Sequence, residues 1–356
     1  MPSLEPTYIH ALQFGAPELT TIHRLGEARG RQDLFLHQFP EQLDTLRTHA
    51  VVESTESSNR LEGIVAGPGR VADLVVNRGL PQNRSEQEIA GYRDALQLIH
   101  ESHADIRFTE NLLLQLHQML YRYQPGLGGR LKSTDHQIVE RDQAGAVVRA
   151  RFTPTAAVAT PQAMTDLTAH YHQAVAGSLA DPLVVLPLAV LDFLCIHPFS
   201  DGNGRTGRLL TLLLLYHFNY RVGRYISLER IVEESRDTYY DALERSSRNW
   251  HQSTHDVHPW LRYFWGVLIR AYDEFETRVV SLQGSKTEQI RAAVSRRTSA
   301  FGIADIEHDC PGVSRDMVRH VLRQMRTDGL LRVNGRGRGA KWRTVEPRPT
   351  PPESAG

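Results

Sequence analysis

The segment His197-Pro198-Phe199-Ser200-Asp201-Gly202-Asn203-Gly204-Arg205-Thr206-Gly207-Arg208 decides how this chain is interpreted. Pro198 disfavours helical geometry at the residue before it, so the apolar helix that precedes the segment should end at His197. The Asp-Gly and Asn-Gly pairs predict a tight loop, and the apolar run after Arg205 predicts a second helix. The backbone amides of residues 202–204 should therefore converge at a helix N-terminus, where the helix dipole and unpaired N–H groups favour an anion.

The charged residues of this segment have the chemistry of a phosphoryl-group transfer site. Arg205 and Arg208 are three residues apart on the first turn of the second helix, so we expect their guanidiniums to reach the same anion. Asp201 supplies a carboxylate suited to Mg²⁺. His197 is the side chain best matched to removing a proton near neutral pH. The simpler alternative, a plain turn with solvent-facing arginines, does not account for this ordered set of residue types.

The segment HPFSDGNGRTGR resembles the complete signature of the Fic family, His-Pro-Phe-x-Asp/Glu-Gly-Asn-Gly-Arg-x-x-Arg, with no departure at a chemical position. Upstream, EQEIAGYRDALQLI (86–99) and LHQMLYRYQPGLGGR (116–130) resemble helices of that family, and roughly Asp44 to Phe264 fits its arrangement. The family's Doc relatives carry Lys in place of Arg205, and its phosphocholine-transferring branch carries Ala in place of Gly202. The resemblance implies a protein adenylyltransferase, which transfers AMP from Mg²⁺-ATP to a Ser, Thr or Tyr hydroxyl of a target protein or of itself.

The resemblance also implies roles for individual residues. His197 would take the proton from the hydroxyl that attacks the α-phosphate, and Asp201 would hold Mg²⁺. Phe199 would anchor the loop in the core. A family Asn that contacts adenine in some members corresponds here to Ser247, so recognition of the base is left open. The residues expected to bind ATP are Gly202, Asn203, Gly204, Arg205, Thr206, Gly207, Arg208 and, by stacking on adenine, Tyr240.

Ser58-Asn59-Arg60-Leu61-Glu62-Gly63 resembles the inhibitory motif of the family, Ser/Thr-x-x-x-Glu-Gly/Asn. Ser58 and Glu62 are one helical turn apart, and Gly63 allows the helix to end there. The resemblance implies that Glu62 pairs with Arg208 and occupies the space of the γ-phosphate. In some relatives the same Glu positions a water that removes AMP, so a hydrolytic role for Glu62 is also open.

The periodicity of apolar residues predicts a mainly α fold. The predicted helices cover residues 43–64, 85–102, 109–123, 161–176, 182–196 and 205–219. Between Asp135 and Phe152, the stretches HQIV and VVRARF flank the polar turn 142–145 and predict a β-hairpin, where the family has a flap that binds target peptides. The expected organisation is an N-terminal helical region with the inhibitory helix (1–84), a Fic domain with flanking helices (85–284), a winged-helix-like domain (285–345) and a disordered tail (346–356).

The C-terminal region has a strong basic excess. From Ser285 to Val345 there are 13 Lys or Arg residues against 6 Asp or Glu residues, whereas the formal charge of the whole chain is zero. Such an excess is typical of a nucleic-acid surface. Helices predicted at 286–299, 302–309 and 313–327, followed by two short strands around the loop 334–339, resemble a winged helix-turn-helix.

Two uses of this region are open, because winged helices also dock proteins and mediate dimerisation. The residues expected to contact DNA are Arg315, Arg319 and Arg323 on the third helix and Arg336 and Arg338 at the tip of the wing. The alternative function is therefore a nucleotide-sensing, DNA-binding regulator that uses the Fic domain as its sensor. An intact His197 argues against pure sensing. Transfer of UMP or phosphate through the same site is not excluded.

The composition and the N-terminal sequence indicate where the protein is located and whether it has a membrane partner. The N-terminus has no basic region followed by an apolar stretch, and no apolar segment reaches the roughly 20 residues that span a bilayer. The two cysteines, Cys195 and Cys310, have no paired spacing that would indicate a metal site or a disulfide framework. We therefore expect a cytoplasmic protein without a membrane partner, and a homodimer remains open.

Overall fold

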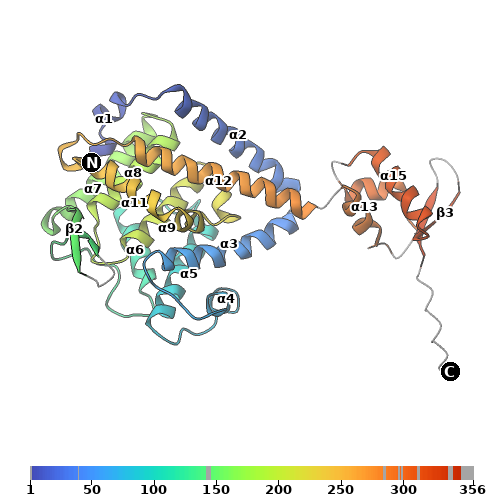
Figure 1. The fold of residues 1–356 in the computed structure, drawn as a ribbon, viewed down its shortest axis with the longest axis horizontal. Helices are drawn as coiled ribbons and strands as arrows, with labels where there is room; N and C mark the ends of the chain where they lie inside the picture. Colours follow the sequence, from blue (N-terminus) through green and yellow to red (C-terminus); the bar gives the residue numbers. More distant parts are fainter. Residues whose placement is uncertain are drawn as a thin grey trace. The chain divides into compact units, whose positions relative to one another are not determined.

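The structure is a computed structural model that describes residues 2–38, 40–141, 146–283, 286–295, 297, 300–310, 313–335 and 340–345. The chain divides into two compact units, Met1–Phe275 and Glu276–Gly356 (Figure 1). The first unit is helical apart from one β-hairpin, and the second combines shorter helices with another two-stranded sheet. Among the described residues, no helix is both long and apolar enough to cross a membrane.

The mainly helical prediction is confirmed. The helices that begin in the first unit are α1 (Pro6–Ala11), α2 (Ala16–Gln38), α3 (Pro40–Arg60), α4 (Arg70–Val76), α5 (Arg84–Ser102), α6 (Glu110–Leu120), α7 (Thr160–Ala176), α8 (Pro182–Ile196), α9 (Asn203–His217), α10 (Leu228–Glu234), α11 (Arg236–Ser247) and α12 (His258–Gln283). The boundaries of α8 are those predicted, whereas α9 begins two residues before the predicted start because Gly202 adopts a left-handed conformation and Asn203 is already helical.

Helix α8 is the centre of the first unit. It is apolar on all sides and packs against α7 and α9. The helix tolerates Pro187 in its interior because the indole N–H of Trp265 donates to the carbonyl of Leu183 over 2.8 Å, which replaces the helical hydrogen bond that proline cannot make. Asp181 caps its N-terminus by accepting from the backbone N–H of Leu183. A rigid, buried α8 therefore fixes the position of the residue that follows it, His197.

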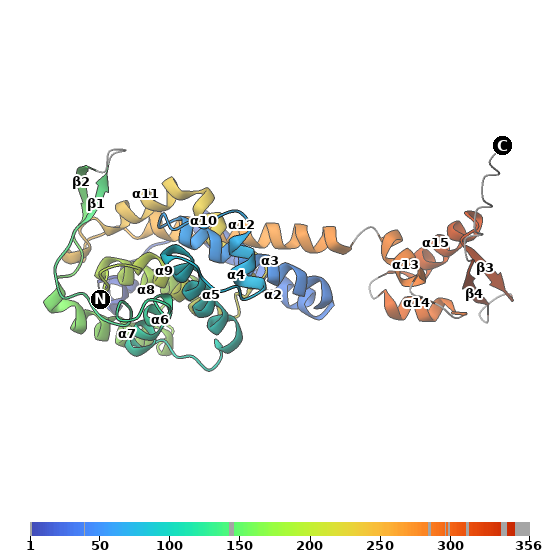
Figure 2. The same cartoon turned by 90° about the horizontal axis from the view of Figure 1, so that it is seen from below.

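The predicted hairpin is present as β1 (Ile138–Arg141) and β2 (Val147–Phe152), paired antiparallel with two register shifts. The predicted turn at 142–145 lies outside the described residues. Figure 2 shows the hairpin beside α11, and Arg149 joins the two elements by donating to Glu140 on β1 and to both carboxylate oxygens of Glu244 on α11. Val147 and Val148 on β2 are exposed.

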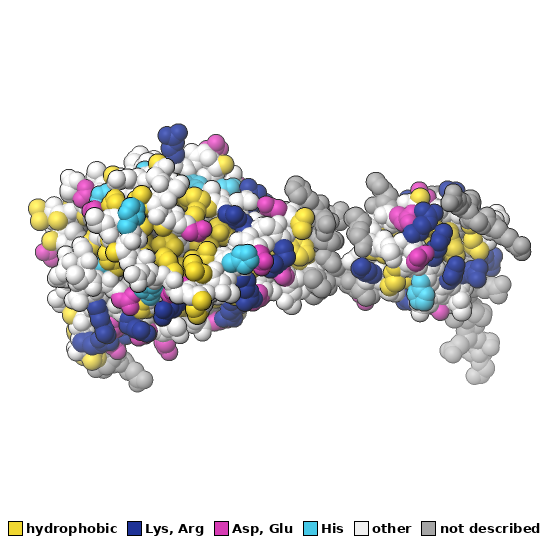
Figure 3. Space-filling model, turned by 90° about the horizontal axis from the view of Figure 1, so that it is seen from above, with side chains coloured by type: hydrophobic (Ala, Val, Ile, Leu, Met, Phe, Trp, Pro, Cys, Tyr) yellow, Lys and Arg dark blue, Asp and Glu magenta, His cyan; other side chains and the backbone are white. Residues whose placement is uncertain are grey.

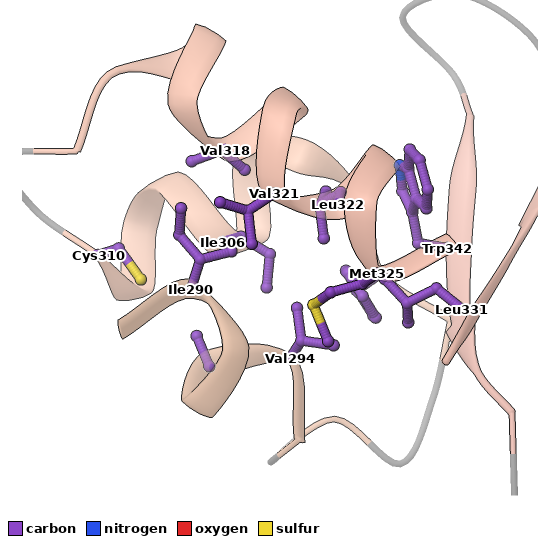
Figure 4. Close-up of a cluster of buried hydrophobic side chains, with 12 residues drawn as sticks. Ile290, Val294, Ile306, Cys310, Val318, Val321, Leu322, Met325, Leu331 and Trp342 are labelled. Atoms are coloured by element: carbon purple, nitrogen blue, oxygen red, sulfur yellow. The ribbon is translucent and has the colours of Figure 1, made fainter. Parts of the chain in front are cut away.

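The second unit has its own hydrophobic core. Its elements are α13 (Lys286–Ser295), α14 (Ile303–Asp309), α15 (Arg315–Thr327), β3 (Leu331–Asn334) and β4 (Lys341–Thr344), in the order that the sequence predicts. The buried face of α15 points toward α13, α14 and the sheet (Figure 4). Trp342 closes this core and its backbone also pairs with Phe301. Gly329, with φ of 77°, reverses the chain between α15 and β3.

Candidate active site

His197 lies at the C-terminal end of α8 in a left-handed conformation, with φ of 50° and ψ of 61°. A residue with a side chain seldom adopts this conformation, so the surrounding structure holds it there. Its Nδ1 lies 3.3 Å from the carbonyl oxygen of Leu194, which places the hydrogen on Nδ1 and leaves a lone pair on Nε2. Burial, together with the neighbouring His136 and Lys132, lowers the pKa of His197 to about 4. The imidazole is therefore neutral near pH 7 and can accept a proton.

Side chains of the glycine-rich loop hydrogen-bond to the backbone of the same loop. Asn203 Oδ1 accepts from the backbone N–H of Phe199 over 2.9 Å, and Asn203 Nδ2 donates to the carbonyl of Phe199 over 2.8 Å. The hydroxyl of Thr206 donates to the carbonyl of Gly202. Gly207 lies against α8, where a Cβ would come within 3.1 Å of a Leu194 methyl. Asn203, Thr206 and Gly207 therefore shape the loop, and their binding of ATP stays a prediction.

Phe199 anchors the loop as predicted, fully buried and stacked on His117 with ring centroids 3.8 Å apart. The backbone N–H of Gly129 donates to His117 Nδ1, so Nε2 carries the hydrogen and donates to the carbonyl of Asp201 over 3.0 Å. His117 therefore connects α6 to the loop in a fixed tautomer. No pattern in the sequence indicates this role.

Asp201 presents a carboxylate at the mouth of the loop, with 68% of its side chain exposed. The hydroxyl of Tyr121 donates to one oxygen and the backbone N–H of Gly202 to the other. Partial burial alone would raise the pKa of Asp201, but the Tyr121 hydrogen bond and the charge of Arg205 outweigh it and lower the pKa. The described residues contain no group of three His, Cys, Asp or Glu that could hold a metal ion. A single exposed carboxylate nevertheless fits Mg²⁺, which takes its other ligands from water and phosphate oxygens.

The two arginines of the loop have different protein partners, and their shared contact with one anion stays a prediction. Arg205 is completely buried, with Nη1 2.8 Å from a carboxylate oxygen of Glu88 and Nη2 donating to the hydroxyl of Tyr121. Glu88 lies on α5, so this ion pair fastens α9 to α5 beneath the loop. Arg208 points instead toward α3. The spacing of three residues placed both arginines near the loop but could not reveal the partner that binds Arg205.

Arg208 makes three contacts with the end of α3, each of 2.8 Å. Its Nε donates to the hydroxyl oxygen of Ser58, and its Nη2 donates to the carbonyl of Ser58 and to Glu62 Oε1. The contact between Glu62 and Arg208 that the resemblance implied is therefore present. Ser58 is buried, so its two bonds with Arg208 are protected from water.

A glycine-terminated helix end holds Glu62 in place. Gly63 has φ of 76°, its N–H donates to the carbonyl of Arg60, and the N–H of Ile64 donates to the carbonyl of Asn59. This pair of bonds is the Schellman arrangement. A Cβ built on Gly204 would lie 2.2 Å from Glu62 Oε1, so the carboxylate rests on the first turn of α9, where a helix N-terminus attracts anions.

Tyr240 lies close to this contact. Burial and then the Glu62 charge raise the pKa of its hydroxyl, and the guanidiniums of Arg151 and Arg236 lie 5.9 Å and 5.7 Å from its ring centre. Tyr239, in contrast, is buried. Tyr240 therefore has the more accessible ring of the two, while its contact with adenine stays a prediction.

Two residues next to His197 were not identified from the sequence. Lys132 is 4% exposed; its ammonium donates to the carbonyl of Ile196 over 3.0 Å and its backbone N–H donates to the carbonyl of Pro198 over 2.8 Å. Burial lowers the pKa of Lys132 to about 8. The ring of His136 lies 5.3 Å from that of His197, and its Nε2 is buried without a hydrogen-bond partner among the described residues. No local pattern marks either residue, because both approach the loop from the segment before β1.

Comparisons with known proteins give a family match for the region that contains this loop. Residues 107–215 match the model of the Fic/DOC family. Over 128 residues the chain is 29% identical to a protein adenylyltransferase Fic of Culex quinquefasciatus, covering 35% of this chain and 23% of that protein. Over 186 residues it is 25% identical to protein adenylyltransferase fic-1 of Caenorhabditis elegans, covering 51% and 32%. A crystal structure of a Fic family protein from Desulfovibrio desulfuricans has a similar fold, with a TM-score of 0.62, 21% identity, and coverage of 94% and 98%.

Proposed function

We propose that this chain, which carries a match to the Fic/DOC family at residues 107–215, is a protein adenylyltransferase that transfers AMP from ATP to a Ser, Thr or Tyr hydroxyl of a protein. The observation that carries the proposal is the loop between α8 and α9. It joins His197, whose imidazole is neutral near pH 7, to the N-terminus of α9, and it carries the exposed carboxylate of Asp201. The chain spans only about a quarter to a third of the two adenylyltransferases that it resembles.

The residues of this loop can supply the separate functions that an in-line transfer requires. The target hydroxyl oxygen attacks the α-phosphorus, its proton passes to His197 Nε2, and the bond to the bridging oxygen of the departing pyrophosphate breaks. The backbone amides of 202–204 and the dipole of α9 would stabilise the phosphate charge. Asp201 would hold Mg²⁺, which when bound supplies positive charge to the phosphates. Lys132, by holding the carbonyl of Ile196, keeps the imidazole at the correct position.

The end of α3 would inhibit this reaction. Glu62 rests on Gly204 and pairs with Arg208, and its carboxylate would occupy the space of an outer phosphate of ATP. While Arg208 is held by Ser58 and Glu62, it cannot orient the γ-phosphate. A second role for Glu62, positioning water to remove AMP from a modified target, is compatible with the same location.

The β1–β2 hairpin would present the target. The exposed Val147 and Val148 and the main-chain groups of a short two-stranded ribbon can add an extended peptide as a further strand. The two ion pairs of Arg149 with Glu140 and Glu244 fix the ribbon relative to α11.

The test is label transfer from α-³²P-ATP to protein in the Glu62→Gly variant. We expect incorporation in Glu62→Gly and none in Glu62→Gly/His197→Ala, because the second variant lacks the base. Ser200→Ala, an exposed position in the same loop, serves as the matched control and should keep the rate of Glu62→Gly. Incorporation that persists without His197 would refute the proposed chemistry. Faster loss of preformed label in the wild type than in Glu62→Gly would add the removal of AMP to its functions.

A further inference from the structure

Acidic residues neutralise only some of the arginines that make the second unit basic. Among the residues of this unit that the structure describes, four arginines have acidic partners. They are Arg291 with Asp328, Arg297 with Asp309, Arg315 with Glu307, and Arg319 with Asp316. Such pairs lower the local field, so these four positions attract an external anion weakly.

Four other arginines are exposed and have no acidic partner among the residues that the structure describes. They are Arg323 and Arg326 on α15, Arg332 on β3 and Arg343 on β4, and we call them the basic surface. Helix α15 packs against β3, so the elements that carry them are neighbours. Figure 3 shows Lys and Arg side chains gathered at the surface of this unit.

The sheet carries the most informative part of this surface. Arg332 and Arg343 face each other directly across the β3–β4 pair, on the side opposite the buried Leu331 and Trp342. Like charges directly opposite in an antiparallel pair are destabilising. Nothing described in the unit compensates for this repulsion, whereas a bound polyanion would. The arrangement therefore costs stability in the free protein and favours binding of an anionic partner.

We propose that the basic surface binds the phosphate backbone of duplex DNA. The outward residues of the sheet are Arg332, Asn334, Lys341 and Arg343. None of these four is a Trp or Tyr, so of the three residue types enriched at the hot spots of protein–protein interfaces only Arg is present. Duplex DNA instead offers about one negative charge per 1.7 Å of its axis, and such a density suits closely spaced arginines.

This assignment differs from the one that the sequence predicted. Arg315 and Arg319 were expected to contact DNA, but each is paired with an acidic residue of the same unit. Arg323 is retained in the basic surface. The predicted wing-tip residues Arg336 and Arg338 lie outside the described residues.

The experiment measures binding of the full-length chain to a fluorescent 20-base-pair duplex by anisotropy, from 50 to 200 mM NaCl. Four phosphate contacts predict a slope of log K against log salt of roughly −3.6, or a loss of roughly a hundredfold over this range. Arg332→Ala/Arg343→Ala should reduce the slope by about two and weaken binding about tenfold or more at low salt. Arg315→Ala/Arg319→Ala is the matched control, which removes as much charge from paired positions and should change binding little.

Thermal unfolding of both double variants serves as the check on folding. The Arg332→Ala/Arg343→Ala variant should not be less stable than the wild type, because it removes a repulsion. Absence of binding at 50 mM salt, or an equal loss in the two double variants, would overturn the proposal. Binding to vesicles of anionic lipid without binding to the duplex would also overturn it. None of these measurements depends on the transfer of AMP, so failure of one proposal is distinguishable from failure of the other.

Discussion

Glu62→Gly should raise the initial rate of AMP transfer by roughly ten- to a hundredfold. Arg208 Nη2 lies 2.8 Å from Glu62 Oε1, and the two side chains are only 8% and 30% exposed. A hydrogen bond between charged groups contributes about 1.5–3 kcal/mol, and about 1.4 kcal/mol corresponds to a factor of ten. Without the carboxylate, Arg208 can make the equivalent contact with the γ-phosphate of ATP, so this free energy becomes available to orient the nucleotide.

Two further variants separate charge from bulk. Arg208→Ala in the Glu62→Gly background should cancel most of the gain, and the two effects should be strongly non-additive because they act through one contact. Glu62→Gln keeps the volume that rests on Gly204 but removes the charge, so its rate should lie between those of the wild type and Glu62→Gly. The assay is the initial rate of α-label incorporation at fixed ATP. An unchanged rate in Glu62→Gly would refute the inhibitory contact, and a wild-type rate in Glu62→Gln would assign the inhibition to bulk alone.

Three further predictions concern buried histidine and lysine side chains. Because the pKa of His197 is lowered to about 4, the neutral base persists in mild acid, so the transfer rate of Glu62→Gly should decline only as the pH falls toward that value. A rate profile with a midpoint near 6.5 would contradict this. Lys132→Met should lower kcat with little change in the KM for ATP, because the lost ammonium holds the end of α8 rather than the nucleotide. Steady-state kinetics would measure both constants. A change confined to KM would contradict this positioning role. Burial also lowers the pKa of His100 to about 3 and of His117 and His255 to about 4. Between about pH 6.5 and 4 these histidines are neutral in the folded protein and protonated in the unfolded chain, so the free energy of unfolding should fall as the pH decreases through that window. Guanidinium denaturation at several pH values measures this free energy. A value that does not change with pH would refute the prediction.

Features set by neighbouring residues were predictable from the sequence. Pro198 ends α8 at Ile196, and the glycines of the loop allow the left-handed turn at Gly202 that starts α9. The i,i+4 spacing predicted that Ser58 and Glu62 lie on one side of a helix; α3 ends at Arg60, and Glu62 in the turn that follows still contacts Arg208 together with Ser58. Short-range rules of this kind depend on local backbone geometry, which the sequence determines directly.

Contacts between distant segments were not predictable. Arg205 and Arg208 have the same charge and similar positions, yet only the packing of α5 against α9 puts Glu88 beside Arg205. Lys132 reaches the end of α8 from 64 positions away from Ile196. A single sequence contains no periodicity that links such pairs, so the partners of a buried charge appear only when the fold brings them together.

The proposed AMP transfer is tested most directly by incubating the Glu62→Gly variant with α-labelled ATP and, separately, with γ-labelled ATP. Mass spectrometry of the modified protein then identifies the group that was added. We expect that the α-label alone is incorporated and that a Ser, Thr or Tyr side chain gains the mass of AMP, with pyrophosphate released. Incorporation of the γ-label, with a gain of phosphate mass, would contradict it, and so would the absence of any modification when ATP and Mg²⁺ are saturating.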